Sequence, residues 1–307
     1  MILTITPSPT LDLTYELADL NADQVNVSKN TLVEGSGKGI LVSMALTEMG
    51  FDCEAMVPIS DSELSLAWRD VVAKKIKINT TYAKREMRIN TSLLHNGKTT
   101  KVNEVAKPLS DEECDEFLKR IEYKAHELRP TWIVLSGHIS SNNVEKIITR
   151  VPEIAKLVGA KLVIDSSGKG LLAAIGAKPD FIKPNMDELI AIKPDAISDP
   201  KRAVLELAKE IGGAVLLSNG NKPAYASDGN ELYELIPSDT PIVNSVGAGD
   251  SSVAGFVAAA EEGKSFLDCI INAMAWGQAA CMTVESGGVK PEFVDLKSIK
   301  YSQLPTT

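Results

Sequence analysis

Short apolar segments rich in β-branched residues alternate along the chain with longer amphipathic segments. The apolar segments predict buried strands, and they lie at residues 2–6, 131–135, 161–164, 181–182 and 214–217. An apolar residue at every third or fourth position predicts helices at residues 40–49, 111–128, 142–157, 200–211, 251–261 and 265–284. Such alternation is typical of a mostly parallel sheet with helices on both faces. The sequence therefore predicts a doubly wound α/β fold.

Two segments interrupt this alternation, at residues 11–33 and 85–106. Apolar and polar residues alternate from position 87 to position 93, as they do in a sheet with one face open to water. We expect the two segments to form a small antiparallel accessory sheet. Because the chain has no internal repeat and no Pro/Gly-rich linker, we expect residues 1–307 to form one domain that carries this sheet.

Composition and charge exclude several classes of protein. The 307 residues include 32 Lys and Arg against 41 Asp and Glu, a net charge of −9, which disfavours nucleic acids and anionic membranes as partners. The apolar runs are much shorter than the ~20 residues that cross a bilayer. The four scattered cysteines lack metal-ligand spacing, and the N-terminus lacks a basic and apolar leader. We expect a cytoplasmic protein with reduced thiols.

The segment Asn244-Ser245-Val246-Gly247-Ala248-Gly249-Asp250-Ser251-Ser252 precedes an apolar helical run. Its two glycines allow the amides of residues 247–249 to face one point at the positive end of that helix, where they can bind an anion. Asp250 at the edge of this point can accept a proton from a hydroxyl, and the combination indicates phosphoryl transfer. The alternative is that Asp250 is an N-cap and the glycines only form a turn.

A second glycine-rich segment, residues 35–39, places Lys38 between Gly37 and Gly39. It is not a P-loop, because position 32 is not Gly and position 39 is neither Ser nor Thr. Helix-start amides together with an ammonium group can still hold a substrate phosphate. Taken alone, the segment favours the alternative of a flexible turn with a solvated lysine.

A third polar segment, Lys183-Pro184-Asn185-Met186-Asp187-Glu188, follows the predicted strand 181–182. Ligands of α/β sheets bind at such carboxyl ends of strands. Asn185 and Glu188 are three residues apart, so their oxygens can face one point and suit Mg²⁺ held mainly through water. The alternative is a helix start in which Asn185 is the N-cap and Glu188 its capping-box partner.

Taken in chain order, the motifs resemble those of the PfkB (ribokinase-like) sugar kinases, in the branch of 1-phosphofructokinase and tagatose-6-phosphate kinase. The resemblance runs through nearly the whole chain, and the segment ending at Asp250 is its most specific part. The matching segments are Leu3-Thr4-Ile5-Thr6 with Asp12, Gly37-Lys38-Gly39, Arg88-Ile89-Asn90, Ser136-Gly137, Ile164-Asp165-Ser166-Ser167, Lys183-Pro184-Asn185 and Val246-Gly247-Ala248-Gly249-Asp250.

The resemblance implies a doubly wound α/β core with a small β-sheet lid over the sugar, and a homodimer through that lid. It implies a kinase that uses ATP and Mg²⁺, in which Asp250 activates the acceptor hydroxyl and Gly247, Ala248 and Gly249 stabilise the transferred phosphoryl group. The resemblance implies that the sugar phosphate is bound by Asp12, Gly37, Lys38, Gly39, Arg88 and Asn90. It implies that ATP is bound by Lys183, Asn185, Ser218, Gly220, Ser245, Gly247, Gly249 and Asn272. Mg²⁺ would be held by Asn185 and Glu188.

The chain departs from the family's pattern where that pattern faces the sugar. Ser8 and Leu41 stand where the branch has asparagine, and His138 lies in a loop that usually reads Ser-Gly-Ser-Leu-Pro. We expect a kinase of a phosphorylated ketohexose, similar to 1-phosphofructokinase or tagatose-6-phosphate kinase. The alternatives are a kinase of an unphosphorylated sugar or nucleoside, and a weakly catalytic protein of the same fold that senses nucleotides or sugar phosphates.

Overall fold

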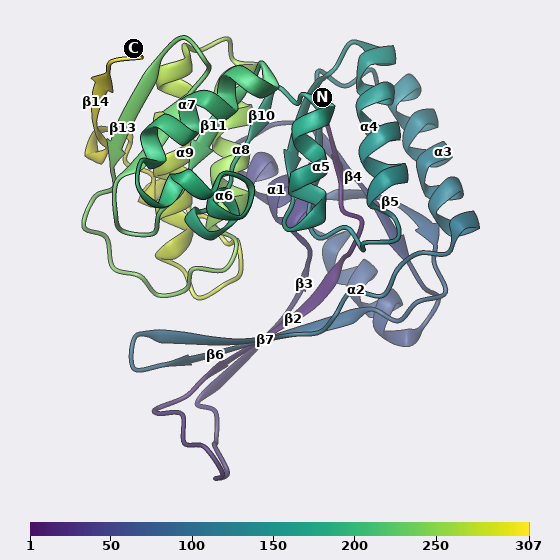
Figure 1. Cartoon of the computed structure of the whole chain (residues 1–307). Helices are drawn as coiled ribbons and strands as arrows, with labels where there is room; N and C mark the ends of the chain where they lie inside the picture. Colours follow the sequence, from purple (N-terminus) through teal and green to yellow (C-terminus); the bar gives the residue numbers. More distant parts are fainter. Residues whose placement is uncertain (307) are drawn as a thin grey trace.

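A ten-stranded sheet forms the centre of the protein in a computed structural model that describes residues 1–306 (Figure 1). From one edge to the other its order is β14-β13-β12-β11-β10-β9-β8-β1-β4-β5, with β12, β13 and β14 antiparallel and the other strands parallel. The strands are β1 (Ile2–Ile5), β4 (Cys53–Ile59), β5 (Lys77–Tyr82), β8 (Trp132–Ser136), β9 (Lys161–Asp165), β10 (Phe181–Ile182), β11 (Ala214–Leu217), β12 (Ala224–Ser227), β13 (Leu232–Ile236) and β14 (Lys300–Leu304).

Helices cover both faces of this sheet, which confirms the predicted doubly wound fold (Figure 1). One face carries α1 (Lys38–Glu48), α2 (Glu63–Val72), α8 (Ala248–Glu261) and α9 (Phe266–Cys281). The other carries α3 (Asp111–Leu128), α4 (Val144–Val158), α5 (Lys169–Ala177), α6 (Met186–Ile192) and α7 (Pro200–Ile211). Short 3₁₀ helices lie at Pro194–Ile197, Pro291–Phe293 and Leu296–Ser298. Within residues 1–306, none of the helices has the length and apolarity that a membrane span requires.

The core is divided into two layers by the alternation of strand residues. Along β1, Ile2 packs in the cluster of α1, α8 and α9, whereas Leu3 packs in the cluster of α3 and α4. Phe181 of β10 stacks on Phe256 of α8 with ring centroids 3.7 Å apart. This contact fixes α8, and with it the loop that precedes α8, against the centre of the sheet.

A second, four-stranded sheet projects from the body (Figure 1), and we call it the lid. It consists of β2 (Thr10–Glu16), β3 (Asn30–Ser36), β6 (Arg88–His95) and β7 (Lys98–Asn103), which come from the two segments predicted to form an accessory sheet. β2–β3 and β6–β7 pair antiparallel, whereas β2 and β6 pair parallel. The parallel pairing arises because both central strands run outward from the body, and the sequence pattern did not indicate it.

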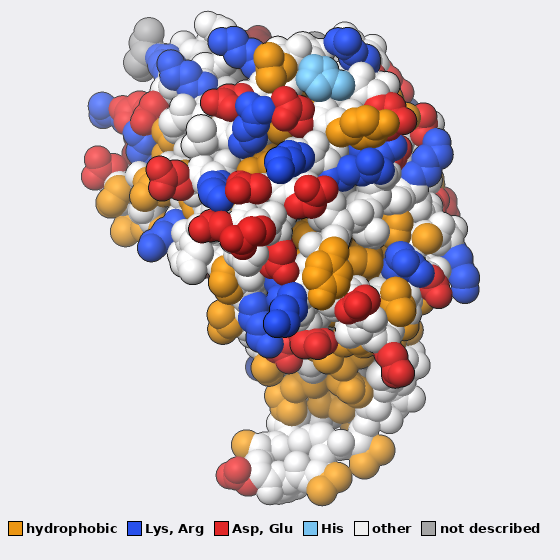
Figure 2. Space-filling view, turned by 90° about the vertical axis from the view of Figure 1, so that its right-hand side faces the viewer, with side chains coloured by type: hydrophobic (Ala, Val, Ile, Leu, Met, Phe, Trp, Pro, Cys, Tyr) orange, Lys and Arg blue, Asp and Glu red, His pale blue; other side chains and the backbone are white. Residues whose placement is uncertain are grey.

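The two faces of the lid differ in polarity. Strand register places Glu34, Asp12 and Asn90 side by side on one face, because each is the Cα partner of the next. The opposite face carries Val33 and Val102, which are 59% and 60% exposed. Figure 2 shows hydrophobic side chains gathered where the lid leaves the body. The lid therefore has a polar inner face and an apolar outer face.

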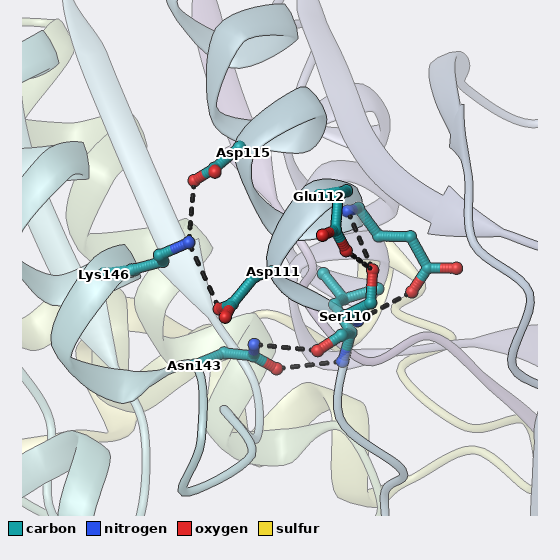
Figure 3. Close-up of polar contacts among 8 residues, drawn as sticks. Ser110, Asp111, Glu112, Asp115, Asn143 and Lys146 are labelled. Carbon is teal, nitrogen blue, oxygen red and sulfur yellow. Dashed lines mark hydrogen bonds and ion pairs between the residues drawn. The ribbon is translucent and has the colours of Figure 1, made fainter.

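Residues 104–110 lead from β7 of the lid to α3, and Figure 3 shows the polar contacts where α3 and α4 begin. Ser110 caps α3, and the side-chain amide of Asn143 bonds both backbone groups of Leu109, at 2.9 and 3.1 Å. Lys146 of α4 pairs with two aspartates in the first turns of α3 at 3.2 and 3.0 Å. These contacts hold the starts of α3 and α4 together.

Candidate active site

The loop before α8 is shaped by its own side chains. Gly247 is the N-cap of α8 with a φ of 83°, in the left-handed region that favours glycine. The Asn244 side chain accepts a hydrogen bond from the Val246 amide at 3.0 Å and donates one to the Val284 carbonyl at 2.8 Å. The structure therefore places the predicted amides at the positive end of a 14-residue helix, where an anion is stabilised.

Lys183, directly after β10, lies against this loop. A Cβ atom on Gly249 would lie 3.1 Å from Lys183 Nζ, so glycine lets the ammonium group approach the helix start closely. The same Nζ is 3.5 Å from Ser218 Oγ, and Ser218 forms a parallel bridge with Asn185. Three of the residues predicted to bind ATP thus lie together at the carboxyl edge of the sheet, and one of them, Lys183, reaches the start of α8.

Asp250 lies in the first turn of α8 and is only 6% exposed. Burial raises the pKa of Asp250 to about 7, and the negative charges of Asp165 and Asp12 add to the rise against the opposing ammonium groups. A carboxylate with a pKa close to neutral is suited to take a proton from a hydroxyl and to release it again. The structure thus brings a buried carboxylate next to the amides at the start of α8.

Asp165 at the end of β9 belongs to this cluster, although the sequence pattern gave it no role. It is 3% exposed, Lys38 Nζ lies 3.2 Å from its carboxylate, and Ser136 Oγ donates to it at 2.9 Å. Burial acts to raise the pKa of Asp165, but the charges of Lys38 and Lys183 outweigh burial and hold that pKa below its usual value.

Lys38, predicted to bind a substrate phosphate, is therefore an ion-pair partner of Asp165. Burial acts to lower the pKa of Lys38, but Asp165, Asp250 and Glu188 raise it above its ordinary value. The side chain is still 42% exposed, and an ammonium group has three donors. One donor serves Asp165, and the others remain accessible to a ligand.

The inner face of the lid supplies the remaining predicted residues. Asp12 accepts hydrogen bonds from Thr10 Oγ1 at 2.9 Å and from Asn90 Nδ2 at 3.2 Å. Arg88 donates to the Glu104 carbonyl at 3.2 Å, while its buried Nε and the buried Oδ1 of Asn90 have no partner among the described residues. Burial lowers the pKa of Arg88, and Asp12 and Glu104 oppose that shift. Unpartnered buried polar atoms of this kind indicate a surface that binds a polar ligand.

Two further basic residues lie beside Arg88, and sequence reasoning missed both as site residues. Arg85 donates to the backbone carbonyls of Lys107, at 2.6 Å, and of Pro7, and burial lowers the pKa of Arg85 to about 10. The pKa of His138 is lowered by partial burial and by the charges of Arg88 and Arg85. The sequence did contain one indication of Arg85: it lies three residues before Arg88, at the start of a lid segment.

Lys101 of β7 is a third basic residue without a predicted role. Partial desolvation lowers its pKa, and the carboxylates of Asp12 and Asp250 oppose the shift. Lys101 is the Cα partner of Ser92, on the inner face of the lid. Its position across the lid from Asp12 could be found only from strand register, which the sequence alone did not provide.

Asn185 and Glu188 form the capping box of α6, the structural alternative considered for this pair. Asn185 Oδ1 accepts from the Glu188 amide and Glu188 Oε2 accepts from the Asn185 amide, both at 2.9 Å. Among the described residues no hydrogen bond involves Glu188 Oε1. The capping role therefore leaves a carboxylate oxygen for water or an ion at this edge.

The other predicted residues differ in how close they lie to this cluster. Gly37 and Gly39 begin α1 on top of β1, and Gly220 forms the turn after β11 with a φ of 61°. Ser245 is exposed in the loop before α8. Asn272 lies on α9, donates to the Asp268 carbonyl at 2.8 Å and packs on Gly255, about two turns beyond the start of α8. The structure does not place Asn272 at the loop.

A buried carboxylate at a helix N-terminus, flanked by lysines and covered by a polar lid face, defines an α/β phosphotransferase site that acts on a hydroxyl. Residues 9–292 match the pfkB family of carbohydrate kinases, and the chain belongs to that family. It is therefore an enzyme, a sugar kinase, and the family uses ATP as phosphoryl donor. The predicted family, fold and enzyme class are confirmed, whereas the roles of individual residues remain predictions.

Relatives of known name cover nearly the whole chain. The tagatose-6-phosphate kinase of Staphylococcus epidermidis is 28% identical over 305 residues, which cover 96% of each protein. A Thermotoga maritima protein described as a possible 1-phosphofructokinase has a TM-score of 0.86 at 22% identity, covering 99% of this chain and 100% of the other. Escherichia coli phosphofructokinase-2 in complex with potassium gives 0.84 at 23% identity, covering 95% and 96%.

Proposed function

We propose that the enzyme transfers the γ-phosphoryl group of ATP to a hydroxyl of a phosphorylated ketohexose. The observation that carries this proposal is the half-buried Arg88 side chain on the inner face of the lid near Asp12, whose buried Nε has no partner among the described residues. Arg85 and Lys101 add positive charge on the same side. Cations held there suit a sugar that already carries a phosphate. The name of the Staphylococcus epidermidis relative agrees with this substrate class.

The proposed reaction divides between the two sides of the site. On the lid side, Asp12 and Asn90 orient sugar hydroxyls while Arg88 holds the substrate phosphate. On the body side, Asp250 takes the proton of the attacking hydroxyl, and the amides of residues 247–249 with Lys183 neutralise charge on the transferred group. ATP lies along Lys183, Asn185, Ser218 and Gly220, the residues gathered at the carboxyl edge of the sheet.

We propose that Asn185 and Glu188 hold the Mg²⁺ that accompanies ATP. The donor set fits, because hard oxygens lie at an exposed edge and Glu188 Oε1 makes no hydrogen bond among the described residues. The described residues contain no group of three or more His, Cys, Asp or Glu that could hold a metal ion. When bound, Mg²⁺ neutralises negative charge on the ATP phosphates.

We also propose that a second copy of the chain covers the outer face of the lid. Val33, Leu13, Thr91 and Val102 form one row across all four strands of that face. Val33 and Val102 are more than half exposed at the two ends of the row, an arrangement typical of an interface rather than of a free surface. Val33→Asp should shift the protein from dimer to monomer in analytical ultracentrifugation, and an unchanged sedimentation coefficient would contradict the dimer.

The substrate proposal is tested by ADP release from Mg-ATP with six acceptors: fructose 1-phosphate, fructose 6-phosphate, tagatose 6-phosphate, fructose, ribose and adenosine. Turnover of a ketose phosphate at a much higher kcat/KM than the unphosphorylated acceptors supports the proposal. Preference for fructose, ribose or adenosine would overturn it. With the best ketose phosphate, Arg88→Met should raise the sugar KM at least tenfold without changing the ATP KM.

A further inference from the structure

Glu34 on the inner face of the lid contacts a loop far away in the chain. Its Oε2 accepts a hydrogen bond from the Ser286 amide at 2.8 Å, across 252 positions. Ser286 is 4% exposed and lies in the loop that follows α9. Burial raises the pKa of Glu34, against the hydrogen bonds from Ser286 and the charge of Lys75. This is a specific, partly buried contact between the lid and the body.

The residue after Ser286 supports the loop that begins α8. The Gly287 amide donates to the Val246 carbonyl at 3.1 Å. A Cβ atom on Gly247 would lie 2.4 Å from Gly287 Cα, so the two glycine backbones are packed directly on each other. Leu41 closes the contact from α1, because a Cβ on Gly287 would lie 2.9 Å from its side chain. Movement of Gly287 therefore moves Gly247.

We propose that Glu34 is a positioning residue that links the lid to the anion-binding loop through the Ser286-Gly287 turn. Glu34 is the Cα partner of Asp12, which lies on the sugar side of the site. One short strand pair thus connects the residue proposed to bind the sugar to the turn behind Gly247. This role rests on the proposed function, because it assigns the lid to the sugar and residues 247–249 to the phosphoryl group.

The linkage depends on an acceptor oxygen rather than on negative charge. Glu34→Gln keeps an oxygen able to accept from the Ser286 amide, whereas Glu34→Ala leaves a buried donor without its partner. Glu16, on the neighbouring lid strand β2, has no side-chain hydrogen bond or ion pair among the described residues, so Glu16→Ala is the matched control. Neither Glu16 nor Glu34 has been assigned to substrate or ATP.

Hydrogen exchange measured by mass spectrometry on the full chain tests the linkage without any substrate. Glu34→Ala should increase the exchange rates of residues 244–250 and 283–290 about tenfold, the effect of losing one hydrogen bond. Glu34→Gln and Glu16→Ala should match the wild type in both segments. Faster exchange confined to 283–290, no change in either segment, or equal effects of Ala and Gln at position 34 would each overturn the proposal.

Steady-state kinetics with the acceptor found in the panel supplies the second readout. Glu34→Ala should lower kcat about tenfold with less than a threefold change in the ATP KM, and Glu34→Gln should restore it. A kcat of Glu34→Ala equal to the wild-type value would overturn the positioning role. If no acceptor in the panel is turned over, the substrate proposal fails, while the exchange experiment still decides whether Glu34 controls the loop.

Discussion

Two glycine-rich helix starts meet in this site, and their glycines serve different purposes. At α1, a Cβ on Gly39 would lie 2.4 Å from Thr6 Oγ1, so this glycine lets the helix pack tightly on β1. At α8, the neighbour of Gly249 is the Lys183 ammonium group, 3.1 Å from the position of a Cβ. The first glycine is required by packing, and the second keeps a cation close to the start of α8.

The lysines at the two helix starts also differ, in whether a carboxylate is paired with them. Lys38 at α1 already has a buried counter-ion, Asp165, at 3.2 Å. Lys183 at α8 has only the Ser218 hydroxyl, at 3.5 Å, as a side-chain hydrogen-bond partner among the described residues. Lys38 therefore has one donor engaged by a buried carboxylate, whereas Lys183 beside the helix amides has no ion-pair partner among the described residues and is available to an anion. Similar sequence motifs therefore do not imply equal roles.

The largest effect expected at the α8 start comes from Asp250→Asn. Loss of the general base should lower kcat by about 10²–10⁴-fold, while ATP affinity measured by calorimetry stays within about threefold. Asp187→Asn, in the exposed first turn of α6, is the matched control and should retain wild-type activity. A loss smaller than tenfold in Asp250→Asn would contradict the role of the carboxylate as a base.

Replacing Gly249 or Gly39 with alanine should distinguish an effect on catalysis from an effect on packing. Gly249→Ala should lower kcat about tenfold by displacing Lys183, without loss of stability, because alanine favours a helix over glycine. Gly39→Ala should instead lower the free energy of unfolding by about 1–3 kcal/mol, because its methyl group overlaps Thr6. Urea denaturation and steady-state kinetics on both variants check this, and the same profile for both would remove the distinction between the two helix starts.

Removal of the paired cation should destabilise the fold. Lys38→Met leaves Asp165 buried without its nearest counter-charge and should cost about 1–3 kcal/mol of unfolding free energy. Adding Asp165→Asn to that variant should recover most of the loss, because a neutral amide needs no counter-ion. Chemical denaturation of the two variants measures the effect. A double variant no more stable than Lys38→Met would show that the ion pair is not what stabilises this region.

The raised pKa of Asp250 should appear in both stability and activity. In the folded state Asp250 keeps a proton up to about pH 7, whereas its usual pKa is 3.8, so its contribution to stability is complete below about pH 4 and is lost as pH rises through 7. The wild type should lose stability relative to Asp250→Asn by at most about 1.4 kcal/mol per pH unit in that window. Wild-type kcat/KM should rise through the same range, and an acid limb near pH 4 would contradict the shift.

The sequence predicted the fold class because strong local patterns agree with the final packing. The strand Phe181–Ile182 and the helices Asp111–Leu128 and Pro200–Ile211 have the predicted bounds. Strand β4 was missed although all seven of its residues are buried, because Glu54 and Pro58 interrupt its apolar pattern. Lys124 of α3 pairs with Glu54 at 3.2 Å, a partner that no local pattern could reveal.

The sequence could predict only those site residues that lie close together in one motif. The loop ending at Asp250 and the segment starting at Lys183 could be found because neighbouring residues in each carry related chemistry. The pairing of Lys38 with Asp165 spans 127 positions, and neither residue signals the other in the sequence. The same applies to Lys101, whose place on the inner face of the lid, in line with Ser92 and Thr14, depends on strand register.

The parallel pairing of β2 with β6 has a consequence for how the lid tolerates insertions. Because successive residues face opposite sides, a one-residue insertion before β6 would turn Ile89 inward and Arg88 and Asn90 outward. A two-residue insertion at the same place would preserve the orientation of every side chain and change only the reach of the strand. In evolving or redesigned relatives of this enzyme, length changes at the base of the lid are therefore expected to occur in even steps.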